Sequence, residues 1–306
     1  MTIHTLGCSF TNWIYPTWAD YIGFHYDTNV INLASPCQGN DTIKKHLYTI
    51  DKSDHVIIMF SGYDRLTVGV DQEYLTKKAK EKKLSHSDIQ NLKNGRCTFF
   101  QTAKPFSAFL RSENKDEPDM YSRFHMMYDM LENIFECQTY LQLKGFDHTF
   151  CMWQGMYNDL THLRAIGQQK ISTENYEGYK TNEIFKRMYD SIDWSKFLQP
   201  KDKGIWEHIL TDKKLVITQS TVDLHPSSYC NFDYFVKYIK PILDVKLDFF
   251  DNLDELGAKA LRFSEYYAGL DESQIETVFP QKSGLYKKDD RDKARQYFFK
   301  IWDTTK

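Results

Sequence analysis

A serine on a glycine turn near the start of the chain is the first residue whose setting predicts chemistry. Ser9 lies in Gly7-Cys8-Ser9-Phe10-Thr11, directly after the apolar run Ile3–Leu6. A strand that ends in Gly-x-Ser places the hydroxyl at the carboxyl edge of a parallel sheet. The N–H groups of the following turn can then hold a developing negative charge. We therefore expect Ser9 to act as a nucleophile, provided that a base lies within reach.

The best candidate for that base lies far along the chain, in Val222-Asp223-Leu224-His225-Pro226-Ser227. A base for serine must come within about 2.6–3.2 Å of the hydroxyl and must itself be oriented by a third group. Asp223 can orient His225 if both residues lie on one loop beyond a strand, and Pro226 stiffens the backbone after the histidine. The two segments together predict Ser-His-Asp chemistry.

The elements that must position these residues alternate between strand and helix. The expected strands are Ile3–Leu6, Val30–Ala34 and His55–Phe60, and the helices between them are Trp13–Gly23 and Asp41–Thr49. This alternation predicts a parallel α/β sheet with right-handed crossovers, whose strands end at one edge. In the third strand, Val56–Phe60 is apolar throughout, as is typical of a strand covered on both faces.

Two large insertions, about 66–118 and 155–210, are expected to interrupt the later part of the sheet. Between and after them we expect a helix over Asp119–Lys144 and strands at His148–Trp153 and Leu215–Thr218. A helical face follows over Phe232–Leu243. The expected organisation is thus an α/β domain over 1–245 and a C-terminal extension of mixed helix and loop over 246–306.

Four blocks in this order resemble the SGNH hydrolase superfamily of GDSL-like esterases and acylhydrolases, over roughly residues 1–245. The Gly7–Thr11 segment resembles the family's Gly-Asp-Ser-x-Thr/Ser block, with Ser9 in the nucleophile position and Cys8 in place of the Asp. The Asn32–Asn40 segment resembles the second block, whose glycine lends a backbone N–H to the oxyanion hole. Gly39 fits that glycine.

The third and fourth blocks complete the resemblance. Phe60-Ser61-Gly62-Tyr63-Asp64 lies where the family has Gly-x-Asn-Asp, so Asp64 matches the last Asp and Tyr63 replaces the oxyanion Asn. Asp223-Leu224-His225-Pro226 resembles the last block, with Asp-x-His in place of the commoner Asp-x-x-His. The resemblance implies a triad of Ser9, His225 and Asp223. The amides of Ser9 and Gly39 would hold the oxyanion with help from Asn40 or Tyr63, and the sequence leaves that choice open.

The resemblance also implies a fold and an activity. The fold is α/β, a flavodoxin-like three-layer sandwich with a parallel sheet of about five strands. The activity is that of a serine hydrolase cleaving an ester, either an O-acyl group on a carbohydrate or a short-chain ester or lipid, through an acyl-enzyme and without a cofactor. Motif spacing also resembles that of SGNH-like proteins from bacteriophages.

Two other function classes stay open beside the hydrolase. A catalytically inactive SGNH-fold binding or structural protein is the main alternative, favoured by Tyr63, by Cys8 and by the two insertions. A phosphate or nucleotide site at the Gly7–Thr11 turn is weaker, because the segment lacks the lysine and the glycines of a P-loop.

The composition and charge of the chain limit the classes of partner that we expect. A formal net charge of −3 over 306 residues argues against a dedicated nucleic-acid binder. No apolar run approaches the roughly 20 residues that cross a bilayer. The N-terminus resembles no secretory signal, so we expect a cytoplasmic protein, in the host cytoplasm if viral.

The six scattered cysteines predict free thiols, and the ten histidines show no paired spacing for a metal. The expected partner is a small-molecule or carbohydrate ester.

Three aromatic residues follow the nucleophile turn: Trp13, Tyr15 and Trp18. Such rings either stack on a carbohydrate or pack in the core. We expect at least one of them to be core.

Overall fold

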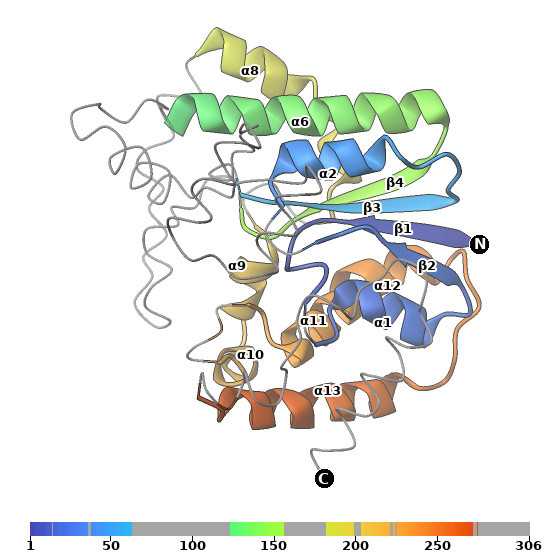
Figure 1. Ribbon diagram of the computed structural model, residues 1–306, viewed down its shortest axis with the longest axis vertical. Coiled ribbons are helices and arrows are strands. Elements are labelled where there is room, and N and C mark those ends of the chain that lie inside the picture. Colours follow the sequence, from blue (N-terminus) through green and yellow to red (C-terminus); the bar gives the residue numbers. More distant parts are fainter. Residues whose placement is uncertain are drawn as a thin grey trace, which may run out of the picture.

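A computed structural model shows how the chain folds (Figure 1). The residues that it describes are 1–13, 15–35, 38–62, 123–155 (side chains from 127), 182–198, 203–220, 223, 225–271 and 274.

A parallel sheet forms the centre of the fold. Its strands are β1 (Thr2–Leu6), β2 (Asn29–Asn32), β3 (His55–Phe60) and β4 (Asp147–Met152), in the order β2-β1-β3-β4. All three neighbouring pairs are parallel. The predicted α/β fold with a parallel sheet is therefore confirmed.

Helices cover both faces of the sheet, which gives three layers (Figure 1). One face carries α2 (Asn40–Leu47), α6 (Arg123–Lys144) and α8 (Glu183–Asp190). The other carries α1 (Trp18–His25), α11 (Ser228–Tyr234), α12 (Lys240–Leu243) and α13 (Leu253–Ala268). A π-helical turn, Phe235–Ile239, joins α11 to α12.

The alternation of side chains along β3 explains why this strand is apolar from Val56 to Phe60. Val56, Ile58 and Phe60 belong to the hydrophobic core under α2 and α6. Ile57 and Met59 belong to the core shared with α1, α11 and α13. Both faces of the strand are buried, so these alternating positions are filled by apolar residues, whereas His55 at the start of the strand has polar partners.

The direction of winding reverses next to β1. Helix α1 leads from β1 to β2 across one face, and α2 leads from β2 to β3 across the other (Figure 1). Open α/β sheets generally bind ligands outside the carboxyl ends of the two strands that flank such a reversal. Ser9 follows β1 and Ser61 follows β3, so the predicted nucleophile lies at this edge of the sheet.

The strand predicted at Leu215–Thr218 is wrong, because this segment lies in and after helix α10 (Lys213–Ile217). Asp212 caps the helix, accepting a hydrogen bond from the Lys214 N–H at 2.8 Å. Leu215 is buried while Ile217 is 72% exposed, so the apolar run does not pack as a strand would. The cap outweighed the strand propensity of the β-branched residues.

The sheet therefore has four strands among the described residues, not about five. Beside β4 there is only an isolated parallel bridge between Phe150 and Phe197, where the Leu198 N–H donates to the Phe150 carbonyl at 2.8 Å.

The insertions and the C-terminal region are described in part. The segment 66–118 lies outside the described residues, whereas 155–210 contributes α8, a 3₁₀ turn at Trp194–Lys196 and α9 (Ile205–Ile209). In the C-terminal region, α13 packs on α11 and shares its core. The side chains of α13 that join this core are Leu256, Ala260, Phe263 and Tyr267.

Helix α1 begins later than the sequence pattern indicated. Thr17 and Asp20 form a capping box, with the Thr17 N–H donating to the Asp20 carboxylate at 2.8 Å, so the helix starts at Trp18 instead of Trp13. Because the helix starts there, Trp13 lies in the turn after β1 and is free to reach the residues beyond α10.

Candidate active site

Ser9, His225 and Asp223 form a chain of hydrogen bonds, although 216 positions separate the first two. The Ser9 Oγ lies 2.7 Å from the His225 Nε2, and the His225 Nδ1 lies 2.6 Å from the Asp223 Oδ1. An ionised carboxylate only accepts hydrogen bonds, so the Nδ1 carries the proton. In a neutral imidazole, the Nε2 is then the acceptor for the serine hydroxyl, as a general base requires.

Burial differs along this chain of hydrogen bonds. Ser9 is 2% exposed, the side chain of Asp223 is 11% exposed and that of His225 is 21% exposed. The imidazole is therefore the member that solvent reaches most easily.

The short Asp-x-His spacing works because the two residues share one tight turn. The His225 N–H donates to the Asp223 Oδ1 at 3.1 Å, so the same oxygen holds both the backbone and the ring of the histidine. The Asp223 N–H donates in turn to the Ser220 Oγ at 3.1 Å. Asp side chains that bond their own backbone two residues on favour such turns.

The second oxygen of Asp223 is anchored by two neutral donors. The Trp13 Nε1–H donates to the Oδ2 at 2.9 Å, and the Tyr267 hydroxyl donates to it at 2.8 Å. Burial raises the pKa of Asp223, but the hydrogen bonds from His225, Trp13 and Tyr267 outweigh it and lower the pKa to about 2. Asp223 is thus ionised over the whole physiological range.

Aromatic rings pack against the imidazole. The Trp13 ring stacks on His225 with centroids 3.6 Å apart, and the Phe10 ring is tilted at 5.2 Å. Phe10 also contacts Trp153 and Trp206, at 4.6 and 6.2 Å between centroids. These contacts fix the imidazole from the side that faces the core.

The three aromatic residues after the nucleophile turn have different settings. Tyr15 and Trp18 are buried in the core, as expected for at least one of the three. Trp13 is partly exposed and lies against His225.

The glycine before Ser9 is required by close packing. A Cβ at Gly7 would lie 2.1 Å from the Thr11 Oγ1 and 3.1 Å from the carbonyl oxygen of Met59. The turn closes with the N–H groups of Thr11 and Asn12 donating to the Cys8 carbonyl, at 2.9 and 3.1 Å. Cys8 itself is fully buried, as expected for a structural thiol.

Asparagine side chains tie this turn to the loop after β2. The Asn12 amide donates to the Ala34 carbonyl, and the Asn32 amide donates to the Thr11 carbonyl, both at 2.8 Å. The loop after β2 leads into α2, so these bonds set where Gly39, the N-cap of α2, lies relative to Ser9.

Asn40 braces Gly39 against the end of β3. Its side chain donates to the Ser61 carbonyl at 3.0 Å and accepts from the Ser61 N–H at 2.7 Å. The Ser61 hydroxyl donates to the Gln38 carbonyl at 2.7 Å. The Asn40 carboxamide is therefore committed to the backbone, which favours a bracing role over direct contact with an oxyanion.

The predicted oxyanion donors are described only in part. Within the described ranges, no acceptor pairs with the backbone N–H of Ser9 or of Gly39, so both remain available to a ligand. Tyr63 and Asp64, the other two predicted site residues, lie outside the described residues, as does Leu224.

The sequence interpretation missed the two donors to Asp223. The four side chains of α13 that join the hydrophobic core recur at spacings of four and three residues, a periodicity that predicts a buried helical face. No sequence signal distinguishes Tyr267, with its acceptor, from the purely packing residues of that face.

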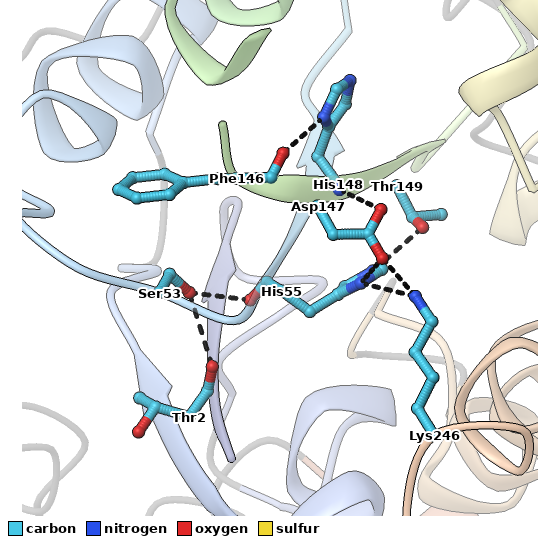
Figure 2. Close-up of polar contacts among 8 residues, drawn as sticks. All are labelled: Thr2, Ser53, His55, Phe146, Asp147, His148, Thr149 and Lys246. Carbon is cyan, nitrogen blue, oxygen red and sulfur yellow. Dashed lines mark hydrogen bonds and ion pairs between the residues drawn. The ribbon is translucent and has the colours of Figure 1, made fainter. Parts of the chain in front are cut away.

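A second polar cluster lies at the opposite edge of the sheet, where β3 and β4 begin (Figure 2). The His55 Nε2 lies 3.0 Å from the Thr149 Oγ1, and its Nδ1 lies 3.2 Å from both the Asp147 Oδ2 and the Lys246 Nζ. Lys246 also donates to the Asp147 carboxylate. Burial and the Lys246 cation lower the pKa of His55 to about 4.

Several bulk features can be stated for the described residues alone. Their four cysteines, Cys8, Cys137, Cys151 and Cys230, are free thiols. No group of three His, Cys, Asp or Glu side chains within the described ranges is arranged to hold a metal ion. None of the helices described in the structure has both the length and the apolar character of a membrane span.

Comparison with other proteins adds no relative. No protein-family model matches the chain, and no curated protein matches it either.

Proposed function

We propose that this protein is a serine hydrolase of the SGNH type that cleaves an ester. The observation that carries the proposal is the Ser9–His225–Asp223 chain of hydrogen bonds, with separations of 2.7 and 2.6 Å. The place of Ser9 after the carboxyl end of β1 supports the proposal, because open parallel sheets bind ligands at this edge.

The first half of the reaction is attack on the ester carbonyl. The Ser9 Oγ bonds to the carbonyl carbon while the His225 Nε2 takes the hydroxyl proton. Asp223 stays ionised, keeps the Nδ1 proton in place and stabilises the imidazolium that forms. Collapse of the tetrahedral intermediate breaks the ester C–O bond, and His225 gives its proton to the leaving alcohol. The product is an acyl group on Ser9.

The second half returns the enzyme to its starting state. Water attacks the acyl carbon, His225 takes a proton from that water, and the Ser9 oxygen leaves with the proton that His225 returns. The products are the free carboxylic acid and the regenerated hydroxyl.

The negative charge on the substrate oxygen would be held by the amides of Ser9 and Gly39. Losing one oxyanion donor typically costs about 10²–10³ in kcat. With Tyr63 in place of the expected Asn, we propose a slower or differently built oxyanion site, to which the Tyr63 hydroxyl or the remaining N–H of Asn40 contributes.

The proposed substrates are O-acyl groups on a carbohydrate, or a short-chain ester or lipid. The indole of Trp13 is partly exposed beside His225, so it offers an apolar surface next to the reacting atoms. This placement fits a small acyl or sugar group better than a charged ligand.

A fluorophosphonate probe tests the proposal without a known substrate. We expect the wild-type protein to be labelled and to hydrolyse aryl acetates, and Ser9→Ala to do neither. Ser195→Ala, which removes an exposed hydroxyl that bonds only Asp193 among the described residues, serves as the control and should behave as wild type. A folded wild-type protein that is neither labelled nor active would contradict the hydrolase and favour the inactive SGNH-fold binding protein.

A further inference from the structure

The carboxylate of Asp223 is held from two sides by residues that the four SGNH-like blocks do not contain. One oxygen accepts from the ring and the backbone of His225, and the other accepts from Trp13 and Tyr267. A carboxylate bonded through one oxygen alone can turn about its Cβ–Cγ bond. With donors on both oxygens, its plane is fixed, and so is the direction in which it holds the imidazole.

Tyr267 reaches this carboxylate from α13, which is itself held firmly. The Ser264 Oγ accepts from the Tyr229 N–H at 2.8 Å, next to the start of α11. A Cβ at Gly257 would lie 2.8 Å from the Phe232 ring, so α13 approaches α11 too closely for any larger residue there. Tyr267 is 2% exposed and its ring packs on Tyr15 at 5.1 Å. The packing of α13 therefore holds the Tyr267 hydroxyl in place beside Asp223.

Trp13 makes two contacts that act on the same histidine. Its indole N–H fixes the carboxylate that orients the ring, and its six- and five-membered rings cover one face of that imidazole. Rotation of the His225 ring away from Ser9 would break the hydrogen bonds at both ring nitrogens and the stacking contact together.

We propose that Trp13 and Tyr267 are positioning residues that hold Asp223, and through it His225, in the geometry needed to accept the Ser9 proton. Helix α13 is then a part of the active site, and the C-terminal region contributes to it by positioning Asp223. The meaning of this arrangement for catalysis rests on the proposed hydrolase function, whereas its effect on the His225 ring does not.

The hydrogen bond between His225 and Asp223 gives the proposal a readout. Asp223 is the charged group in contact with the imidazole among the described residues. Tyr267 is a neutral donor to Asp223, because burial and the nearby carboxylate raise the pKa of its hydroxyl. Without the donor from Tyr267 or Trp13 the carboxylate can turn, and its hydrogen bond to the His225 Nδ1–H weakens.

The NMR signal of the His225 Nδ1–H proton, in protein with isotope-labelled histidine, measures this effect without any substrate. We expect Tyr267→Phe and Trp13→Phe to shift this signal upfield relative to wild type, because the hydrogen bond to Asp223 becomes weaker. The Phe at position 13 keeps a ring over the imidazole but lacks the donor. Tyr266→Phe and Trp194→Phe are matched controls: Tyr266 neighbours Tyr267 on α13 and is 41% exposed, and Trp194 donates to the distant Tyr189 carbonyl.

The same variants are then compared by their rate of fluorophosphonate labelling. We expect about a tenfold slower labelling in Tyr267→Phe and Trp13→Phe, at unchanged far-UV circular dichroism, and wild-type rates in both controls. A purely structural role for the two residues would lower thermal stability without moving the His225 Nδ1–H signal.

The results separate the two proposals. A shifted His225 Nδ1–H signal in Tyr267→Phe and Trp13→Phe, together with a wild-type protein that no probe labels, supports the positioning role and contradicts the hydrolase. A wild-type Nδ1–H signal and wild-type labelling rates in folded Tyr267→Phe and Trp13→Phe overturn the positioning role and leave the hydrolase standing.

Discussion

The indole of Trp13 stacks on the imidazole of His225, with ring centroids 3.6 Å apart and an angle of 23° between the ring planes. A cation over an aromatic face is favoured by about 0.5–2 kcal/mol, whereas a neutral ring gains less. In the proposed reaction, His225 is a cation only while it holds the Ser9 proton. The stacking would therefore stabilise the state near the tetrahedral intermediate more than the resting state.

The first prediction concerns the proton on the His225 Nδ1. Asp223→Asn replaces a pure acceptor by a carboxamide that can present its N–H₂ to the ring, which would place the imidazole proton on the wrong nitrogen. We expect kcat for an aryl acetate to fall by about 10³–10⁴ with little change in KM, because the loss falls on the transition state. Steady-state kinetics measure both constants.

A matched variant tests whether an Asp→Asn substitution elsewhere in the chain would have the same effect on kcat. Asp212→Asn makes the same chemical change at the N-cap of α10, where Asn serves as well as Asp. Its kcat should equal that of wild type. A kcat within threefold of wild type in Asp223→Asn would mean that Asp223 does not orient the base.

The second prediction tests the brace at Asn40. Asn40→Ala leaves the buried N–H and carbonyl of Ser61 without the partners that they have at 2.7 and 3.0 Å. We expect the free energy of unfolding to fall by about 1–3 kcal/mol and kcat to fall as Gly39 loses its support. Urea unfolding gives the first value. Asn133→Ala, which removes a local bond within α6, is the control and should change stability by less than about 0.5 kcal/mol.

Sequence reasoning singled out Ser9, His225 and Asp223 because serine-hydrolase chemistry has local signatures. Gly7 and Ser9 follow a strand, and Asp223 and His225 share a turn, so each pair can be recognised within a few residues. That the two pairs meet was expected because a strand was predicted just before Asp223, and this premise was wrong, since helix α10 lies there. Ser9 and His225 are nevertheless 2.7 Å apart.

The contact that holds Asp223 from α13 was not predictable, because it joins segments that are distant in the sequence. Tyr267 meets Asp223 across 44 positions, through the packing of α13 on α11, and its hydroxyl has no local signal. The error at Leu215–Thr218 has a different origin. A short apolar run is compatible with a strand or with a buried helical turn, and here the N-cap by Asp212 favours the helix.

The third prediction concerns the close contact at Gly7. In Gly7→Ala, the new Cβ would meet the Thr11 Oγ1 at 2.1 Å and the Met59 carbonyl at 3.1 Å, so the turn that carries Ser9 must move. We expect a loss of about 1–3 kcal/mol in the free energy of unfolding, as for other overpacked sites. Fluorophosphonate labelling should fall as well. Gly269→Ala adds a methyl group that meets no atom closer than 3.5 Å, and it should leave both properties unchanged.

The fourth prediction is a dependence of stability on pH that arises at the far edge of the sheet. Burial and Lys246 hold the pKa of His55 at about 4, below its usual value of 6.5 in an unfolded chain. Between these two values the unfolded chain binds a proton that the folded protein does not, so stability falls as the pH falls from about 6.5 to about 4. The loss from His55 alone is of the order of 3 kcal/mol.

Asp147 lies beside His55 but does not act in the same range (Figure 2). Burial raises its pKa, yet the hydrogen bond and charge of Lys246 and the contact with His55 outweigh this and bring the pKa to about 2. Its contribution is therefore present above pH 3.8, the usual Asp value, and is lost only as the pH falls from there through about 2. Above about pH 4 the slope should come from histidine and not from this carboxylate.

Urea unfolding at several pH values between 4 and 7 checks the assignment, with His55→Gln as the comparison. The glutamine keeps polar atoms near Thr149 but does not titrate, so the difference in stability between wild type and variant should shrink as the pH falls. His4 and His148, whose pKa values burial also lowers, contribute equally to both proteins and cancel in this difference. A difference that stays constant across the range would show that His55 is protonated equally in the folded and unfolded states, contrary to the prediction.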